Sequence, residues 1–206
     1  MKKSASKDEV KYAVFCDAGS SGPESSSFAD SIGDISSYLD DLIDSAKKVV
    51  PADRQASTPI YLYATAGMRL LENDKKNAVI SEVNKLLSNK GFSPFHFKKD
   101  FVKIISGQEE ALYGWITVNF IKGVFSQKTS GWSSYWVRLT NFLKGIFSQK
   151  TSGRTYRALD LGGASTQNTF RTRKDSALVT FEPTLAGKTY PVFAHSYLSF
   201  GVNEAR

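Results

Sequence analysis

The stretch ALDLGGASTQ, residues 158–167, has the pattern of a buried strand that ends at an acid and turns through two glycines. Apolar residues surround Asp160, and small side chains with hydroxyl or amide groups follow the glycines. Because glycine has no side chain, the backbone N–H groups of such a turn can approach an anion closely, and hydroxyls add further donors. A polyphosphate needs many donors and little bulk. The stretch therefore predicts a strand end that faces an anionic ligand.

Two other stretches have the same organisation. VKYAVFCDAGSSG (10–22) is an apolar strand followed by Asp17 and a Gly/Ser turn, and TPIYLYATAG (58–67) is an apolar strand that ends in small residues. Ligands of open α/β sheets bind in the crevice beyond the strand ends. Any one of these turns alone is more simply explained as a tight connection. Together, the three turns indicate a ligand site.

Helices are expected between the strands. Apolar residues recur at helical spacing from 35 to 49, before Pro51, and again over 68–89 and 111–123. Further strands are expected over 100–105, 177–183 and 188–200. The alternation of strands and helices predicts an α/β fold with a mixed sheet.

Composition limits the classes of function. The chain has 206 residues, enough for a sizeable core, and Lys and Arg exceed Asp and Glu by 27 to 20. The lysines are scattered rather than grouped, so no nucleic-acid partner is expected. Cys16, the only cysteine, is expected to be a buried apolar residue, and no intrachain disulfide can form. Residues 1–9 are expected to be disordered, and neither a signal peptide nor a transmembrane segment is expected.

One segment occurs twice. NFIKGVFSQKTSG (119–131) returns as NFLKGIFSQKTSG (141–153), with only Ile121 and Val124 replaced, by Leu143 and Ile146. Two copies are too few for a repeat architecture. The duplication is therefore expected to lengthen a loop near 119–153.

The acids near these turns suggest the chemistry. Asp17 and Asp160 would stand at strand ends, and two carboxylates there suit a divalent cation held through water. Glu109 and Glu110 begin a predicted helix, where acids often simply complement the helix dipole. Beside turns that can hold phosphate, one of them is also a candidate base for the activation of water.

Four motifs carry a resemblance to a known family. DAGSSG (17–22), ATAGMRLL (64–71), ISGQEEALYGW (105–115) and LDLGGASTQ (159–167) resemble, in this order, the first four conserved motifs of the ecto-nucleoside triphosphate diphosphohydrolases, or apyrases. HSYLSFG (195–201) is similar to a further family segment, so that the resemblance covers roughly residues 10–206. It implies an actin/Hsp70-like (ribonuclease H-like) fold and Ca²⁺- or Mg²⁺-dependent removal of terminal phosphates from nucleoside tri- and diphosphates. It also implies a cell-surface or secretory-lumen location.

The resemblance also implies roles for single residues. Glu110 matches the catalytic base, while Ser165 and Gln167 match residues that position the attacking water. Asp17, Asp160 and Thr65 match the side of the site that holds the metal through water. The phosphate-binding positions are Ser20, Ser21, Gly22, Gly162, Gly163 and Ala164.

The sequence departs from the family pattern in four places. The strand that normally follows the first motif is missing after Gly22, and the chain stops at Arg206, before the fifth motif and the second lobe. Ala111 replaces a usual glycine, and Ser199 replaces a cysteine of several cell-surface members. Residues 10–206 are accordingly expected to form the first, N-terminal lobe alone, with little or no activity.

Alternatives to an active enzyme follow from these departures. One is a non-catalytic fragment or splice form that binds metal and phosphate weakly and self-associates through an exposed apolar lobe face. Another is a different ATPase of the same fold, such as a sugar kinase or a chaperone ATPase. The ATAGMRLL and SGQEEALYGW segments argue against the latter, because kinase chemistry needs neither of them.

Overall fold

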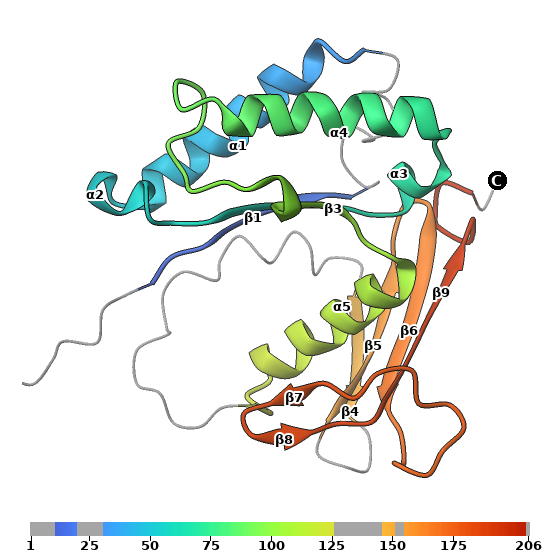
Figure 1. Ribbon diagram of the computed structural model, residues 1–206. Helices are drawn as coiled ribbons and strands as arrows, with labels where there is room; N and C mark the ends of the chain where they lie inside the picture. Colours follow the sequence, from blue (N-terminus) through green and yellow to red (C-terminus); the bar gives the residue numbers. More distant parts are fainter. Residues whose placement is uncertain (1–10, 20–30, 126–145, 151–154, 205–206) are drawn as a thin grey trace, which may run out of the picture. The chain divides into compact units, whose positions relative to one another are not determined.

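The computed structural model describes residues 11–19, 31–125, 146–150 and 155–204, and these residues divide into two compact units. Unit 1 comprises 11–18, 31–64 and 68–104. Unit 2 comprises Gly19, Thr65–Gly67 and the described residues from Ile105 onward. The segments 1–9 and 20–22 lie outside the described residues, and the assignment of 10–206 to one lobe stays a prediction. Each unit is treated by itself below (Figure 1).

Unit 1 is built on a parallel sheet. Its strands β1 (Val14–Ala18), β2 (Ile60–Ala64) and β3 (Val102–Ile104) lie in the order β1-β2-β3. Cys16 pairs with Leu62, which pairs with Val102. The long helices are α1 (Asp34–Val49) and α4 (Asn73–Ser88). The shorter helical segments are α2 (Ala52–Gln55), the 3-10 turn Lys99–Phe101 and α3 (Ala66–Leu70), of which unit 1 contains the residues from Met68 onward.

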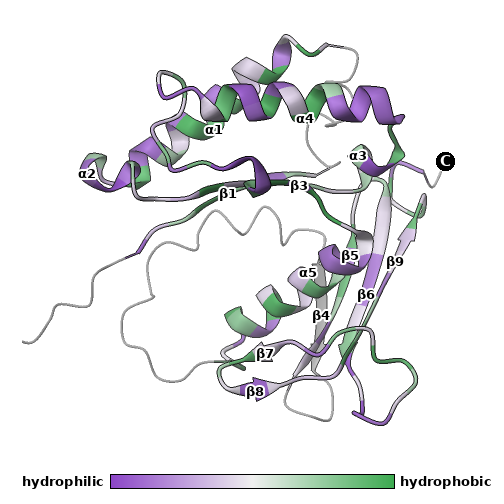
Figure 2. Ribbon diagram, viewed as in Figure 1, coloured by the Kyte–Doolittle hydropathy of each residue, from purple (hydrophilic) through white to green (hydrophobic). Residues whose placement is uncertain are grey.

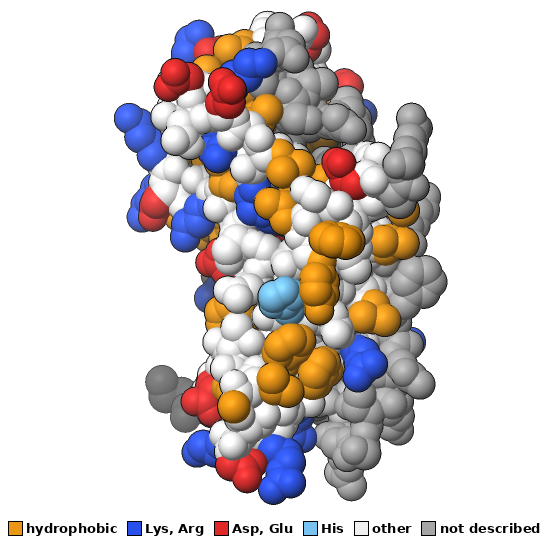
Figure 3. Space-filling model, turned by 90° about the vertical axis from the view of Figure 1, so that its right-hand side faces the viewer, with side chains coloured by type: hydrophobic (Ala, Val, Ile, Leu, Met, Phe, Trp, Pro, Cys, Tyr) orange, Lys and Arg blue, Asp and Glu red, His pale blue; other side chains and the backbone are white. Residues whose placement is uncertain are grey.

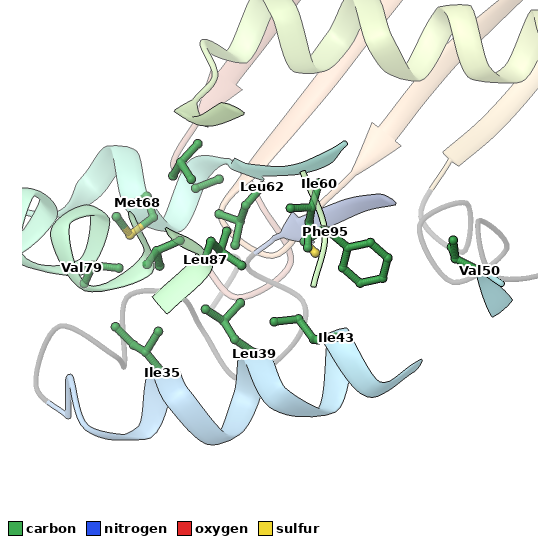
Figure 4. Packing of buried hydrophobic residues seen from close by; sticks show 14 residues of the cluster. Ile35, Leu39, Ile43, Val50, Ile60, Leu62, Met68, Val79, Leu87 and Phe95 are labelled. Atoms are coloured by element: carbon green, nitrogen blue, oxygen red, sulfur yellow. The ribbon is translucent and has the colours of Figure 1, made fainter. Parts of the chain in front are cut away.

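The core of unit 1 lies between the sheet and the long helices. Ile35, Leu39 and Ile43 recur at the spacing of one helix face, and Figure 4 shows them pointing from α1 toward β2. Val79, Val83 and Leu87 form the buried face of α4 in the same way, and the hydropathy colouring shows apolar and polar stretches alternating along both helices (Figure 2). The predicted helix over 35–49 is therefore confirmed, and it ends before Pro51, as expected.

The helix predicted over 68–89 is divided into two. Glu72 lies between α3 and α4 with an extended backbone (ψ 151°), and the Lys76 N–H is the first to bond back to the Glu72 carbonyl. The amphipathic pattern runs through the break because both helices contribute buried apolar residues to one core, Met68 from α3 and Val79 from α4.

Unit 2 is built on an antiparallel sheet with the order β4-β5-β6-β9. Helix α5 (Gly107–Ile121) packs on β5, β6 and β9 (Figure 1). Its core holds the fully buried Trp115, whose ring centroid lies 5.7 Å from that of Phe125 and 6.0 Å from that of Tyr190. The strands are β4 (Ile146–Lys150), β5 (Tyr156–Leu161), β6 (Ser165–Arg171), β9 (Val192–Leu198) and a separate small pair, β7 (Thr184–Leu185) with β8 (Lys188–Thr189).

The predicted α/β fold class is confirmed: the described strands pair in parallel in unit 1 and antiparallel in unit 2. Two finer predictions for unit 2 need correction. No strand forms over 177–183, because the N–H groups of Thr180 and Phe181 both donate to the single carbonyl of Val192 instead of alternating along a partner. The expected loop of the duplication contains β4, which pairs with β5, and its first residues continue α5 to Ile121.

Candidate active site

A tight turn joins β5 to β6 at the position of the two glycines. The Gly162 N–H donates to the Ser165 carbonyl at 3.0 Å, which closes the turn. A Cβ atom at Gly162 would lie 3.0 Å from that same carbonyl oxygen, closer than nearly all real Cβ contacts. A side chain is therefore disfavoured here because it would press on the hydrogen bond that shapes the turn.

Three predicted site residues share one face of the β5–β6 pair. Asp160 lies directly opposite Gln167 in the antiparallel register, and residues opposite each other project to the same side of a sheet. Ser165 stands two residues before Gln167 in β6, so that it projects to that side as well. The predicted grouping of these side chains beside the glycine turn is thus present within one hairpin.

Gln167 is held between two serines. Its side chain is buried, with an exposed fraction of 1%, and its Nε2 donates to Ser165 Oγ at 2.6 Å and to Ser196 Oγ at 3.2 Å. Its Oε1 has no hydrogen-bond partner among the described residues. An unpaired buried acceptor is costly unless a water or ligand donates to it. The amide is therefore fixed on its donor side and offers an acceptor on the other.

The first turn of α5 lies over the same face. Thr169, on the side of β6 that carries Ser165 and Gln167, donates from Oγ1 to the Ala111 carbonyl at 3.0 Å. Glu110 is the residue before Ala111, so this hydrogen bond also keeps the backbone of Glu110 near this part of the sheet. The N-terminal end of α5 lies at the end of the sheet where β5 passes into β6 (Figure 1).

The neighbouring residues Glu109 and Glu110 differ in their part in the helix cap. Glu109 forms a capping box with Ser106: its N–H donates to Ser106 Oγ at 3.1 Å, and its Oε2 accepts from the Ser106 N–H at 2.8 Å. This interaction satisfies two backbone groups at the helix start. Glu110 takes no part in the box. The structural explanation for acids at this helix start therefore applies to Glu109.

The remaining predicted residues are distributed as follows. Thr65 is buried and falls in unit 2, together with Glu110 and Asp160. Asp17 is the penultimate residue of β1 in unit 1, so its proximity to Asp160 stays a prediction. Burial of the Asp17 carboxyl raises its pKa to about 6, although the residue as a whole is exposed to solvent.

A profile of the GDA1/CD39 (nucleoside phosphatase) family matches residues 22–206. The chain belongs to this family. It is 40% identical over 190 residues to ectonucleoside triphosphate diphosphohydrolase 1 of Bos taurus, covering 89% of this chain and 34% of the relative. It is 37% identical over 228 residues to ectonucleoside triphosphate diphosphohydrolase 3 of Mus musculus, covering 95% of this chain and 40% of the relative.

The fold agrees with that of a solved nucleoside triphosphate hydrolase structure. The crystal structure of nucleoside triphosphate hydrolases from Neospora caninum matches with a TM-score of 0.54 at 18% identity, covering 85% of this chain and 32% of that one. The chain thus spans about a third to two fifths of the length of the relatives it matches. In the parts of the chain that the structure describes, no helix is long and apolar enough to cross a membrane.

The sequence of this GDA1/CD39 member did not reveal two contributors to the site. Ser196 fixes the Gln167 amide, and Thr166 donates from Oγ1 to the Phe200 carbonyl at 2.5 Å. Ser196 and Phe200 both belong to the HSYLSFG segment (195–201), whose similarity to a family segment assigned no role to either residue. That segment contacts the turn because β9 pairs with β6.

Proposed function

We propose that the protein hydrolyses the terminal phosphates of nucleoside tri- and diphosphates. Glu110 accepts a proton from a water molecule, whose oxygen attacks the terminal phosphorus. The bond from phosphorus to the bridging oxygen breaks, which releases inorganic phosphate and a shorter nucleotide. Ser165 and Gln167 orient the water, and backbone N–H groups of the two motif turns bind the phosphates. The relatives' names support this substrate class.

One observation carries most of the proposal. The Gln167 amide is buried, its Nε2 is held by two serines, and its Oε1 lacks a partner among the described residues. An acceptor held in this way is suited to take a hydrogen bond from water. Asp160 stands opposite it across the strand pair. These features lie beside the bare turn Gly162–Ala164, which leaves room for phosphate.

The available donors fit a cation bound through water. No cluster of three or more His, Cys, Asp or Glu side chains suited to a metal occurs among the residues that the structure describes. Direct coordination by many protein ligands is therefore not supported, whereas Mg²⁺ and, less strictly, Ca²⁺ accept oxygen ligands together with water. We propose Asp17, Asp160 and Thr65 for this role. The cation would neutralise charge on the phosphate oxygens.

The test measures phosphate release from ATP and ADP by this chain in the presence of Ca²⁺ or Mg²⁺. Glu110→Gln is expected to abolish release. Glu109→Gln is the matched control, because glutamine preserves the capping box, and it should retain the activity. Absence of release by the correctly folded chain would contradict the proposal for this chain and favour the other expectation from the sequence, a non-catalytic fragment with little or no activity. Equal release by both variants would remove Glu110 as the base.

The location of the reaction follows the same relatives. The prefix "ecto" in their names supports an extracellular or luminal site of action, which we propose for this protein as well. Cys16 is buried and free, so at an extracellular or luminal location the described residues would have no disulfide bond to stabilise their core.

A further inference from the structure

A short segment after β9 holds the glycine turn by its carbonyl groups. Within residues 199–203, which we call the strap, the Ser199 N–H donates to the Ala164 carbonyl at 2.9 Å. The Val202 N–H donates to the Gly162 carbonyl at 3.0 Å, and the Asn203 N–H donates to the Gly163 carbonyl at 2.9 Å. The strap therefore engages all three carbonyl groups of the turn.

This pattern fixes the direction of the peptide groups. In a trans peptide, the carbonyl of one residue and the N–H of the next point in opposite directions. Because the carbonyls of Gly162 and Gly163 point to the strap, the N–H groups of Gly163 and Ala164 point away from it. Anions are bound by N–H groups and repelled by carbonyl oxygens. The strap thus holds these two N–H groups on the side of the turn away from it, in an orientation that suits an anion.

Gly201 makes this approach sterically feasible. A Cβ atom at Gly201 would lie 2.1 Å from Gly163 O, 2.3 Å from Gly163 C and 2.4 Å from Ala164 N. Real Cβ atoms do not come so close to backbone atoms, so any side chain would push the strap off the turn. Position 201 requires glycine because the backbones of the strap and of the turn are in direct contact, which leaves no space for a side chain.

The side chains of the strap contribute little to burial. Phe200 and Val202 are 70% and 53% exposed. Hydrophobic side chains, drawn in orange, also gather on the face of the molecule shown in Figure 3. The contact with the turn is therefore made by backbone groups. One side chain adds to it from the sheet, since Thr166 Oγ1 donates to the Phe200 carbonyl.

We propose that the strap positions the phosphate turn and that Gly201 is its essential residue. This inference rests on the proposed function, because it assumes that the turn binds phosphate. A purely structural strap would leave anion binding unchanged wherever the sheet stays folded. A positioning strap would change the affinity of the turn for an anion in a folded protein.

The experiment uses ¹⁵N-labelled chain titrated with inorganic pyrophosphate and followed by amide chemical shifts. Wild type is expected to show saturable shifts at Gly163 and Ala164. Gly201→Ala should weaken binding about tenfold, the equivalent of one well-formed hydrogen bond, while the shifts of the β6–β9 pair stay native. Gly33→Ala is the control, because a Cβ there meets nothing within 4 Å.

The outcomes separate the two hypotheses. Failure of wild type to bind would contradict the phosphate role of the turn itself. Equal affinity in a folded Gly201→Ala variant would overturn the strap inference alone. If that variant does not fold, Thr166→Val and Thr166→Ser take its place. Loss of affinity in the valine variant with recovery in the serine variant supports the inference, and equal affinities contradict it.

Discussion

Asn119, near the end of α5, forms a two-way hydrogen bond with the backbone of Tyr156 at the start of β5. Its Nδ2 donates to the Tyr156 carbonyl at 3.0 Å, and the Tyr156 N–H donates to its Oδ1 at 2.6 Å. The same Nδ2 also donates to the Trp115 carbonyl at 2.9 Å. A fully buried amide thus acts as a strand partner and links the helix to the sheet that carries the candidate site.

The first prediction concerns this link. Asn119→Ala should lower the free energy of unfolding by about 1–3 kcal/mol, because it leaves polar backbone groups of Tyr156 without partners. Faster hydrogen exchange at the Tyr156 amide, together with urea unfolding, measures the effect. Asn77→Ala, on the exposed face of α4, should stay within about 0.5 kcal/mol. Unchanged exchange at Tyr156 would show that the link contributes nothing.

The second prediction separates the neighbouring glutamates by stability. Glu109→Ala should cost about 0.5–2 kcal/mol, because it removes the carboxylate that accepts from the Ser106 N–H. Glu109→Gln should cost much less, since glutamine also forms the capping box. Thermal unfolding of the two variants beside wild type checks this. Equal losses in both would mean that the charge near the helix start, rather than the cap, stabilises α5.

The sequence predicted those parts of the fold that depend on nearby residues. Ile35, Leu39 and Ile43 lie on a single helix, so their spacing along the sequence identifies its buried face. Each strand before a small-residue turn is likewise a single continuous apolar run. The break at Glu72 and the absent strand over 177–183 were not predicted. The absent strand depends on the distant carbonyl of Val192, and periodicity within a segment does not contain that information. The break at Glu72 is a local change to an extended backbone, which the continuous apolar pattern conceals.

The candidate site was also predicted only where nearby residues form it. Asp160, Ser165 and Gln167 meet because a single hairpin brings them together, and all three lie in the LDLGGASTQ motif whose resemblance to the apyrase family indicated them. Ser196 and Gly201 come from a strand and strap well beyond the hairpin, and only the pairing of β6 with β9 brings them to it. Whether Asp17 joins this group depends on the placement of one compact unit against the other.

The third prediction is a dependence of stability on pH. Because burial raises the pKa of Asp17 from 3.8 to about 6, the folded chain binds more protons than the unfolded chain between these values. The contribution of Asp17 to stability is therefore fully present below pH 3.8 and is lost as the pH rises through about 6. Asp17→Asn should match wild type at low pH and exceed it at pH 7.

Urea unfolding of both proteins at several pH values measures the difference. The expected result is a difference in the urea midpoint between the variant and wild type that grows with pH. A constant difference would mean that the Asp17 carboxyl titrates normally in the folded chain. Because Asp17 as a whole is exposed, solvent screening reduces the size of the effect without changing its sign.

The fourth prediction concerns the reactivity of Cys16. Burial, with a smaller contribution from the charge of Asp17, raises the thiol pKa from 9.0 to about 12. At pH 8 only about one thiol in ten thousand is then ionised in the folded chain, against about one in ten after unfolding, and the thiolate is the reactive form. Alkylation by iodoacetamide should therefore be very slow in buffer and rapid in urea, as followed by mass spectrometry. Rapid alkylation in buffer would show that β1 opens readily, since the side chain is 8% exposed and packs in the core of unit 1.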